Sequence, residues 1–224
     1  MVKSIDFINE SIFNYLGADD YAVFMATTGL CDGIRLNDGV VWVQYNNNNE
    51  ITAIMATGKD NKRLVFSSDN ADIDELQFII GNNDKNDLDK KYLLKKNVVN
   101  SVVENGIDKS QYGRIKNLNK ETVETNGEIS AFKVILNSLG KCEGALISVN
   151  HTDVSGGFIT FSQKISLITD IYTNEQYRNK GYGKAIVEKL LNLSVNERVY
   201  LISKEHNLDF YKKCGFEIVK EIYV

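Results

Sequence analysis

Residues 178–184, with the sequence Arg-Asn-Lys-Gly-Tyr-Gly-Lys, lie between an apolar run at 165–173 and an amphipathic run at 184–193. The apolar run predicts a strand and the amphipathic run predicts a helix. A glycine-rich turn from a strand into a helix presents unpaired backbone N–H groups at the positive end of the helix dipole. Gly181 and Gly183 allow the backbone to approach an anion closely, and neighbouring basic side chains add charge. The stretch therefore predicts a phosphate-binding turn.

Two other phosphate-binding motifs fit these residues less well. The dinucleotide fingerprint G-x-G-x-x-G needs a glycine where this chain has Ile186. The P-loop needs a glycine at the position of Arg178 and a serine or threonine at that of Ala185. Taken alone, the turn also fits an ordinary loop that uses glycine only for its geometry, and that alternative stays open at this point.

A second informative segment follows at residues 207–217, with the sequence Asn-Leu-Asp-Phe-Tyr-Lys-Lys-Cys-Gly-Phe-Glu. A short helix is expected through Tyr211, and the Gly215-Phe216 pair is expected to open the last strand. Between the two segments the pattern predicts one helix and one short strand.

These segments together resemble the GNAT superfamily, the acyl-CoA-dependent N-acyltransferases. The Arg-x-x-Gly-x-Gly spacing at 178–183 resembles the family's pyrophosphate signature, and 168–173 resembles the strand before it. Asn207, Tyr211 and the Gly-Phe pair resemble the family's late helix-to-strand segment. The matches stand in the family's order, and the resemblance covers roughly residues 108–224.

The predicted fold class is α/β. We expect a GNAT-like three-layer α/β/α domain with a mixed, mostly antiparallel sheet at 107–224, preceded by a smaller α+β domain at 1–106. Gly106 marks the boundary. The first domain is either a degenerate second copy of the GNAT fold or a divergent accessory domain.

Periodicity and turn residues predict the individual elements of the chain. In the first half we expect three helices: one at 4–16, one that begins at Asp69 or Asn70 and ends at 80, and one at 88–104. We expect strands at 40–45, 51–57 and 63–67, with a hairpin tip at 46–50. In the second half we expect strands at 112–118, 142–149, 157–161, 165–173, 198–203 and 216–224, helices at 129–139, 184–193 and 208–213, and a turn at 151–156. Only one helix is then expected before the second strand of this half, where the family commonly has two.

The resemblance implies acetyl-CoA as the co-substrate and assigns residues to its binding. The pyrophosphate would lie on the turn, and the pantetheine arm would pair with the backbone of a strand that splays from its neighbour. The expected acetyl-CoA-binding residues are Ile171, Tyr172, Thr173, Arg178, Asn179, Lys180, Gly181, Tyr182, Gly183, Lys184 and Asn207.

Acyl transfer also needs groups that move protons. Tyr211 matches the family's general acid, and a phenol with an ordinary pKa of about 10 is protonated at neutral pH. Some family members carry a catalytic glutamate early in the fourth strand, where this chain has Leu167, so Asp170 becomes the expected base or amine-binding group. Weaker alternatives for the base are Glu175, His151 and a chain of water molecules, and His206 is expected to cap a helix or contact CoA.

Composition limits the class of protein. The 224 residues are 43% hydrophobic and 25% charged, with a formal net charge of −4, which argues against nucleic-acid binding and favours a cationic substrate. Neither a membrane-spanning run nor a secretory signal is expected. The three cysteines show no disulfide or metal spacing, so we expect a cytoplasmic protein without a metal.

The leading functional hypothesis is an N-acetyltransferase, an acyltransferase enzyme, that transfers an acetyl group from acetyl-CoA to a primary amine of a small molecule or peptide. The alternative is a non-catalytic CoA- or acyl-CoA-binding sensor or scaffold. Tyr211 favours the enzyme, and the absence of a strand glutamate favours the alternative. The acceptor, the acyl-chain preference and the oligomeric state, with a homodimer as one option, are left open.

Overall fold

The computed structural model describes residues 1–5, 11–12, 14–17, 40–57, 63–79, 90–99, 106–118, 136–138, 140–161 and 165–223. The chain forms two compact units. The first contains Met1–Leu93 with Ser203–Glu205 and Val219–Val224, and the second contains Leu94–Ile202 with His206–Ile218. The division into domains at 106 and 107 that the sequence predicts stays a prediction.

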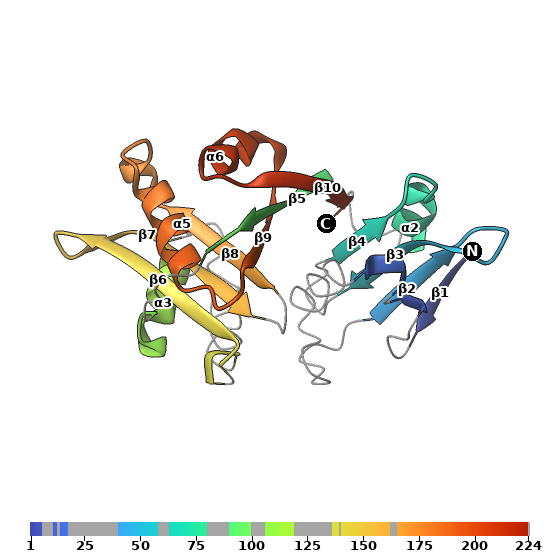
Figure 1. Ribbon diagram of the computed structural model, residues 1–224, viewed down its shortest axis with the longest axis horizontal. Helices are drawn as coiled ribbons and strands as arrows, with labels where there is room; N and C mark the ends of the chain where they lie inside the picture. The colour runs from blue at the N-terminus through green and yellow to red at the C-terminus, as the bar shows by residue number, and fades with distance from the viewer. Residues whose placement is uncertain are drawn as a thin grey trace. The chain divides into compact units, whose positions relative to one another are not determined.

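The first unit is built on antiparallel strands in the order β1-β2-β3-β4 (Figure 1). They are β1 (Val2–Ile5), β2 (Val40–Tyr45), β3 (Ile51–Thr57) and β4 (Arg63–Ser67). Tyr223, in the last strand β10 (Glu217–Tyr223), pairs with Val65 of β4. The predicted hairpin between β2 and β3 is confirmed. At its tip the side chain of Asn46 accepts the backbone N–H groups of Asn48 and Glu50.

One helix, α2 (Ile73–Ile79), belongs to the core of this unit. Leu76 packs with alternate residues of β3, Ala53 and Met55, and all three are buried. The helix starts later than predicted, because Asp72 rather than Asp69 or Asn70 accepts the N–H of Glu75 and so caps the first turn.

Two helices predicted in the first half are wrong in part or in whole. The helix expected at 4–16 starts too early, since Ser4 pairs with Trp42 in a β-ladder, and only 11–12 and 14–17 are described as helical. The helix expected at 88–104 is wrong, because strand β5 (Lys90–Asn97) occupies most of it. The three consecutive buried residues 92–94 lie between lysines, and so short an apolar run does not distinguish a strand from a helix.

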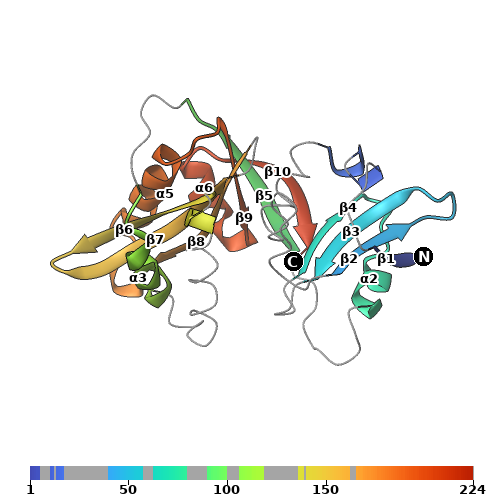
Figure 2. The same cartoon turned by 90° about the horizontal axis from the view of Figure 1, so that it is seen from below.

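The second unit contains a mixed sheet in the order β5-β9-β8-β7-β6, which β5 enters from Leu94 onward (Figure 2). The other strands are β6 (Cys142–Val149), β7 (Thr152–Phe161), β8 (Ser166–Thr173) and β9 (Arg198–Ser203). β6, β7 and β8 are antiparallel, and β8 and β9 are parallel. The predicted mixed sheet is confirmed, and the predicted limits of β6, β8 and β9 agree with the structure within one residue.

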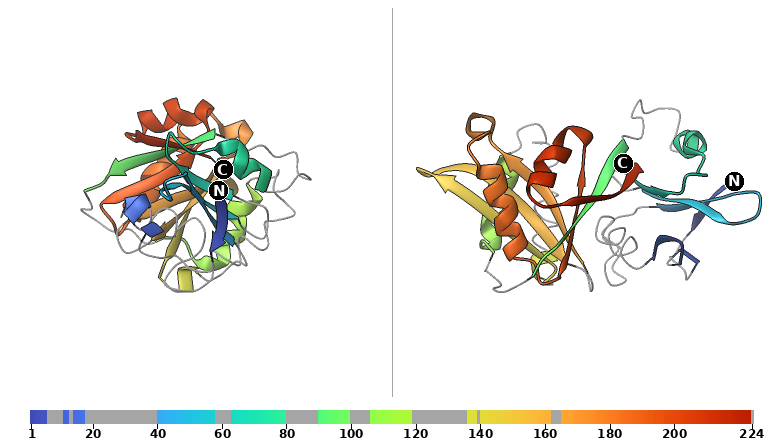
Figure 3. Two further views of the ribbon diagram at one scale, coloured as in Figure 1. Left: turned by 90° about the vertical axis from the view of Figure 1, so that its right-hand side faces the viewer. Right: turned by 45° about the horizontal axis from the view of Figure 1, so that its top comes forward.

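Helices cover both faces of this sheet, as the three-layer prediction required (Figure 3). A Cβ atom added at Gly156 would meet Ile115 of α3 (Tyr112–Asn117). A Cβ atom added at the next residue, Gly157, would meet Leu190 of α5 (Tyr182–Asn192). Because successive residues of a strand point to opposite faces, α3 and α5 lie on opposite sides.

Helix α3 corrects the predicted strand at 112–118. The carboxylate of Asp108 accepts the N–H of Ser110 and starts a 3-10 turn (Lys109–Gln111) that leads into the helix. Tyr112, Ile115 and Leu118 repeat every three residues and are all buried. Residues 136–138 are helical as well, so the described residues between β5 and β6 include two helical segments rather than the single helix expected there.

The hairpin between β6 and β7 is tighter than predicted. Asn150 and His151 alone form the turn, both with positive φ (48° and 65°), and the rest of the expected turn, up to Gly156, lies inside β7. Arg114 of α3 holds this hairpin through both carboxylate oxygens of Asp153. The bonded guanidinium lowers the pKa of Asp153.

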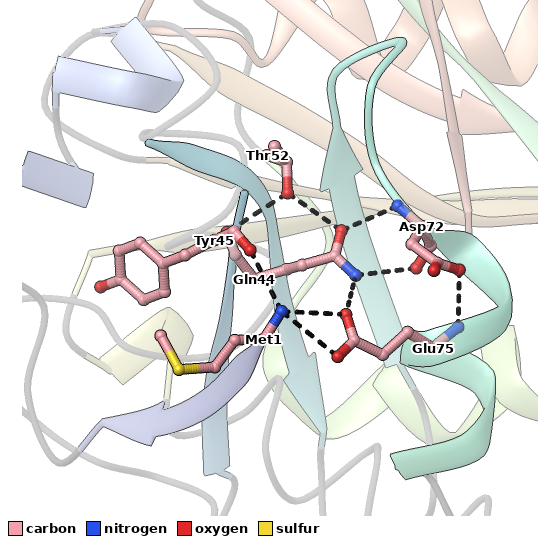
Figure 4. A network of polar contacts seen from close by, with 6 residues as sticks. All are labelled: Met1, Gln44, Tyr45, Thr52, Asp72 and Glu75. Atoms are coloured by element: carbon pink, nitrogen blue, oxygen red, sulfur yellow. Dashed lines mark hydrogen bonds and ion pairs between the residues drawn. The ribbon is translucent and has the colours of Figure 1, made fainter. Parts of the chain in front are cut away.

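A buried polar network fixes α2 on the sheet of the first unit (Figure 4). The Gln44 amide group donates to the carbonyl of Asp72 and to Glu75, both at 2.8 Å. Its oxygen accepts the N–H of Asp72 at 2.9 Å and the hydroxyl of Thr52 at 3.0 Å. Glu75 also lies 3.3 Å from the ammonium of Met1. All donor and acceptor positions of the Gln44 side chain are therefore used.

We expect Gln44→Ala to lower the free energy of unfolding by about 3 kcal/mol, because it leaves the N–H of Asp72 and the hydroxyl of the buried Thr52 without this acceptor. Urea denaturation measures the loss. Asn47→Ala, at an exposed position of the neighbouring hairpin tip, is the control and should change stability little. A loss for Gln44→Ala no larger than that of the control would show that the network does not stabilise the unit.

Candidate active site

Strand β8 parts from its neighbour β9 half-way along its length. The parallel ladder joins Ser166 to Val199 and ends where Ile168 pairs with Leu201. The register with β9 does not extend to the last residues of β8, 171–173. The splaying that the family resemblance implies is confirmed, and it leaves one backbone edge of β8 outside the sheet's ladder.

A β-bulge lies at the point of separation. Thr169 pairs with Phe158 and Tyr172 with Gly156, so the single residue Gly157 faces both Asp170 and Ile171. Asp170 has a φ of 55°, the left-handed conformation typical of one class of bulge. The exposed Asp170 thus lies where the two-residue alternation breaks. Regular alternation along β8 would place Asp170 on one face with Ile168 and Tyr172, and the bulge interrupts that alternation between Thr169 and Tyr172.

The end of β8 is held by a buried serine of β7. The hydroxyl of Ser155, which is fully buried, donates to the carbonyl of Tyr172 at 3.0 Å and lies 2.8 Å from the hydroxyl of Thr173. The N–H of Asn174 donates to the carbonyl of Val154 at 2.8 Å. These bonds fix the last residues of β8 in front of the glycine turn.

The glycine turn has the backbone geometry of an anion site. A 3-10 turn (Glu175–Tyr177) leads into residues 178–181, in which Asn179 and Gly181 have φ values of 61° and 86°. Gly181 then begins α5, and no described side chain caps the helix. The N–H groups of the first turn lack acceptors within the helix, so this end can bind an anion.

Basic and aromatic side chains surround the turn. Arg178 donates from Nε to the carbonyl of Thr173 at 3.3 Å and lies 3.4 Å from Glu175. Its guanidinium lies 5.8 Å from the ring centre of Tyr172, and the ammonium of Lys180 lies 5.2 Å from that of Tyr177. The ion pair is exposed, and such pairs contribute about 0–1 kcal/mol, so a phosphate can replace Glu175 at little cost.

Three of the sequence segments singled out above meet at Gly183. A Cβ atom added there would lie 3.4 Å from the hydroxyl of Thr173 and 3.4 Å from the ring of Phe210. The first turn of α5 therefore contacts both the end of β8 and α6 (Leu208–Lys213). Any side chain longer than a methyl group at this position would have to displace one of them.

Tyr211 lies on α6 beside two other rings. Its ring centre is 5.0 Å from that of Phe210 and 6.2 Å from that of Phe216, both in edge-to-face orientation. Burial, followed by the nearby Cys214 thiol, raises the pKa of Tyr211 to about 12. Among the described residues, no hydrogen bond engages its hydroxyl. It is therefore a protonated donor that is not engaged elsewhere.

The remaining candidates are scattered. His206 and Asn207 end the exposed 3-10 turn (Glu205–Asn207) that precedes α6. His151 lies in the β6–β7 turn, and among the described residues no hydrogen bond or ion pair connects it with the glycine turn or Tyr211. Leu167 is buried and paired with Tyr200, so at this position the chain has a core side chain rather than a charged one.

Two residues of the site escaped the sequence analysis. Ser155 lies in the stretch 151–156, for which the sequence predicts a turn, and nothing in that stretch indicates a buried hydroxyl. Phe210 stands next to the motif tyrosine, where an aromatic residue signals only a buried position. Among the described residues no group of His, Cys, Asp or Glu side chains has the arrangement of a metal site. No described helix is long and apolar enough to cross a membrane.

Solved structures share the fold of the whole chain. An acetyltransferase of the GNAT family from Colwellia psychrerythraea covers 100% of this chain and 98% of its own, with a TM-score of 0.53 at 10% identity. A GCN5-related N-acetyltransferase from Sphaerobacter thermophilus covers 94% of this chain and 87% of its own, with a TM-score of 0.56 at 9% identity. At these identities the similarity establishes the fold alone.

Sequence comparison adds the family. Residues 141–218 match the family model of the acetyltransferase (GNAT) domain. The chain is 32% identical over 137 residues to glucosamine 6-phosphate N-acetyltransferase 1 of Dictyostelium discoideum, covering 60% of this chain and 81% of the relative. The residues that match the family model contain the glycine turn and Tyr211. The chain belongs to the GNAT family of N-acetyltransferases, which use acetyl-CoA as the acetyl donor.

Proposed function

We propose that this protein transfers the acetyl group of acetyl-CoA directly to a primary amine of a small molecule or peptide, with Tyr211 as the general acid. The observation that carries the proposal is the meeting of three segments at Gly183. There the anion-binding turn lies within van der Waals distance of Thr173 at the end of β8 and of Phe210 in the helix that carries Tyr211.

The residues at the turn suit the two phosphates that join the adenosine and pantetheine parts of CoA. The uncapped start of α5 and two left-handed residues support N–H donation, and Arg178, Lys180 and Lys184 supply positive charge. The pantetheine arm has amide groups that can pair with the backbone of residues 171–173 as an added strand would. We assign Asn207, which precedes α6, to a further contact with CoA.

Acetyl-CoA, when bound, supplies the thioester that the amine attacks. The thiolate that leaves is the anion of an acid with a pKa near 8.5, so complete proton transfer from a phenol of pKa about 12 is unfavourable by about 3.5 units. Tyr211 therefore acts first as a hydrogen-bond donor to the sulfur as charge develops. Over the whole reaction the amine loses one proton and the leaving sulfur takes up one, so no net proton is released.

We propose Asp170 as the group that binds the amine or accepts its proton. It is exposed, it lies at the bulge where β8 leaves β9, and its carboxylate suits an ammonium group. A left-handed conformation is unusual for a residue other than glycine and is found often at functional positions.

The relative from Dictyostelium discoideum suggests the first acceptor to test. Its name identifies glucosamine 6-phosphate as its substrate, an amino sugar with one amine and one phosphate. We propose a small amine of this kind, so the acceptor screen begins with glucosamine 6-phosphate and continues with glucosamine, polyamines and peptide amines. Release of CoA thiol measures turnover. No turnover with any of these amines, combined with firm binding of acetyl-CoA, would favour the non-catalytic sensor instead.

Substitutions in the turn should weaken binding of acetyl-CoA. We expect Arg178→Ala to raise the Kd about tenfold, by loss of one charged contact with phosphate. Gly183→Val should abolish measurable binding, because its methyl groups would displace Phe210 or Thr173. Isothermal titration measures both, and Lys189→Ala, which removes an exposed charge from the last turn of α5, is the control. Unchanged affinity in both turn variants would disprove the assignment of this site.

Removal of the Tyr211 hydroxyl should slow the reaction without affecting the donor. We expect Tyr211→Phe to reduce kcat about a hundredfold while the KM for acetyl-CoA stays within about twofold. Tyr45→Phe, in the first unit, is the matched control. If kcat of the Tyr211 variant equals that of the wild type, Tyr211 is not the acid.

The pH dependence gives a second test of the same role. Because the pKa of Tyr211 is raised to about 12, the phenol stays protonated from neutral pH to about pH 11. Loss of its proton then cannot cause a decline of kcat below about pH 10. The alkaline limb of the kcat profile should accordingly have the same midpoint in wild type and Tyr211→Phe. A limb in the wild type near pH 9 that vanishes in the variant would contradict the raised pKa.

For Asp170 we expect Asp170→Asn to lower kcat/KM for the amine about tenfold and to leave the Kd for acetyl-CoA unchanged. Asparagine tolerates the left-handed conformation, so the bulge should persist. Steady-state kinetics with varied amine measures the effect, and Asp74→Asn in α2 is the control. An unchanged kcat/KM would remove Asp170 from the site and leave a water chain or Glu175 as the base.

A further inference from the structure

The end of α6 is a compact turn that holds the backbone of Tyr211. The carbonyl of Tyr211 accepts the N–H groups of Cys214 at 3.0 Å and Phe216 at 3.1 Å. Gly215 has a φ of 85° and donates to the carbonyl of Lys212 at 2.9 Å. A left-handed glycine with these bonds closes a helix at its C-terminal end. The orientation of Tyr211 therefore depends on this turn.

Lys96, a residue of β5, holds the turn from outside. Its ammonium donates to the carbonyl of Cys214 at 2.7 Å, across 118 positions of sequence. A Cβ atom added at Gly215 would lie 3.2 Å from the Lys96 nitrogen and 3.4 Å from the adjacent carbon. Among the described residues, Lys96 has no carboxylate partner, and the Cys214 carbonyl is its hydrogen-bond acceptor. The lysine thus lies directly on the turn.

The contact is of a kind that fixes a helix end. The last carbonyls of a helix have no donor within the helix and lie at its negative end, and a bond from an ammonium is stronger than one between neutral groups. Because β5 is a strand of the sheet in this unit, Lys96 connects the short helix to a rigid element. Its neighbour Lys95 makes a different contact, 5.8 Å from the ring centre of Tyr200.

We propose that Lys96 is a positioning residue for Tyr211, because it fixes the C-terminal turn of α6 and so orients the hydroxyl. The inference rests on the proposed function, in which Tyr211 donates to the leaving sulfur. Lys96 acts on Tyr211 through its ammonium bond to the backbone of the turn, and not through a direct charge interaction with the Tyr211 hydroxyl. In agreement, the raised pKa of Tyr211 follows from burial and Cys214, without a contribution from Lys96.

The first measurement needs no acceptor. Hydrogen exchange of the Cys214 and Phe216 amides, both bonded to the Tyr211 carbonyl, should become about tenfold faster in Lys96→Met, which keeps the length of the side chain and removes the ammonium. Lys96→Arg should restore slow exchange, and Lys95→Met should behave as the wild type. Equal exchange rates in the wild type and Lys96→Met would overturn the inference.

The second measurement is a double-mutant cycle with Tyr211→Phe, using acetyl-CoA and the amine that the screen identifies. We expect Lys96→Met alone to reduce kcat about ten- to a hundredfold with the KM for acetyl-CoA within about twofold, and Lys96→Arg to recover most of it. In the Tyr211→Phe background the same substitution should have no further effect on kcat. An equal loss in both backgrounds would overturn the positioning role while leaving Tyr211 as the acid. No loss in Tyr211→Phe itself would refute the acid role, and the positioning inference with it.

Discussion

The early end of the ladder between β8 and β9 is the constraint on which the rest of the site depends. Fully paired strands would leave no backbone edge for a ligand. The register between β8 and β9 ends at Ile168, next to the bulge at Asp170 in the ladder between β7 and β8. The bonds of Ser155 then fix Thr173 at the end of the freed strand. Because Gly183 has no side chain, α5 starts directly against Thr173 and Phe210, and the turn, the strand and α6 share one small region.

The parts of the fold that the sequence predicted well are those in which local signals agree with tertiary structure. The strands β2, β3, β4 and β9 and the helix α6 agree with the sequence predictions to the residue, and each is bounded by a glycine or asparagine nearby. The wrong predictions are short segments whose pattern fits two structures. Tyr112 to Leu118 alternates apolar and polar residues in part, yet the cap at Asp108 and the three-residue spacing make it helical. The bulge at Asp170 was not predictable, because it follows from pairing with β7, which local sequence does not encode.

A hydrogen-bond network around Gln44 stabilises the first unit. Gln44 uses all its hydrogen-bonding positions to join a strand, a neighbouring strand and the cap of α2. A buried amide satisfied in this way favours one arrangement of helix and sheet over the alternatives that an apolar contact would allow. The family resemblance covered only the second half of the chain, whereas the solved structures share the fold over nearly all of it, so the first half is part of the same architecture despite its lack of a motif.

Strand β5 precedes Gly106, yet from Leu94 onward it belongs to the second unit. A fragment that starts after Gly106, which the motifs alone would suggest as a minimal enzyme, would omit this strand. The edge of β9 would then present unpaired N–H and C=O groups to other molecules, a common cause of edge-to-edge aggregation. The sequence motifs of the family therefore do not mark the smallest piece of this chain that can be expected to fold without aggregating; that piece begins before β5.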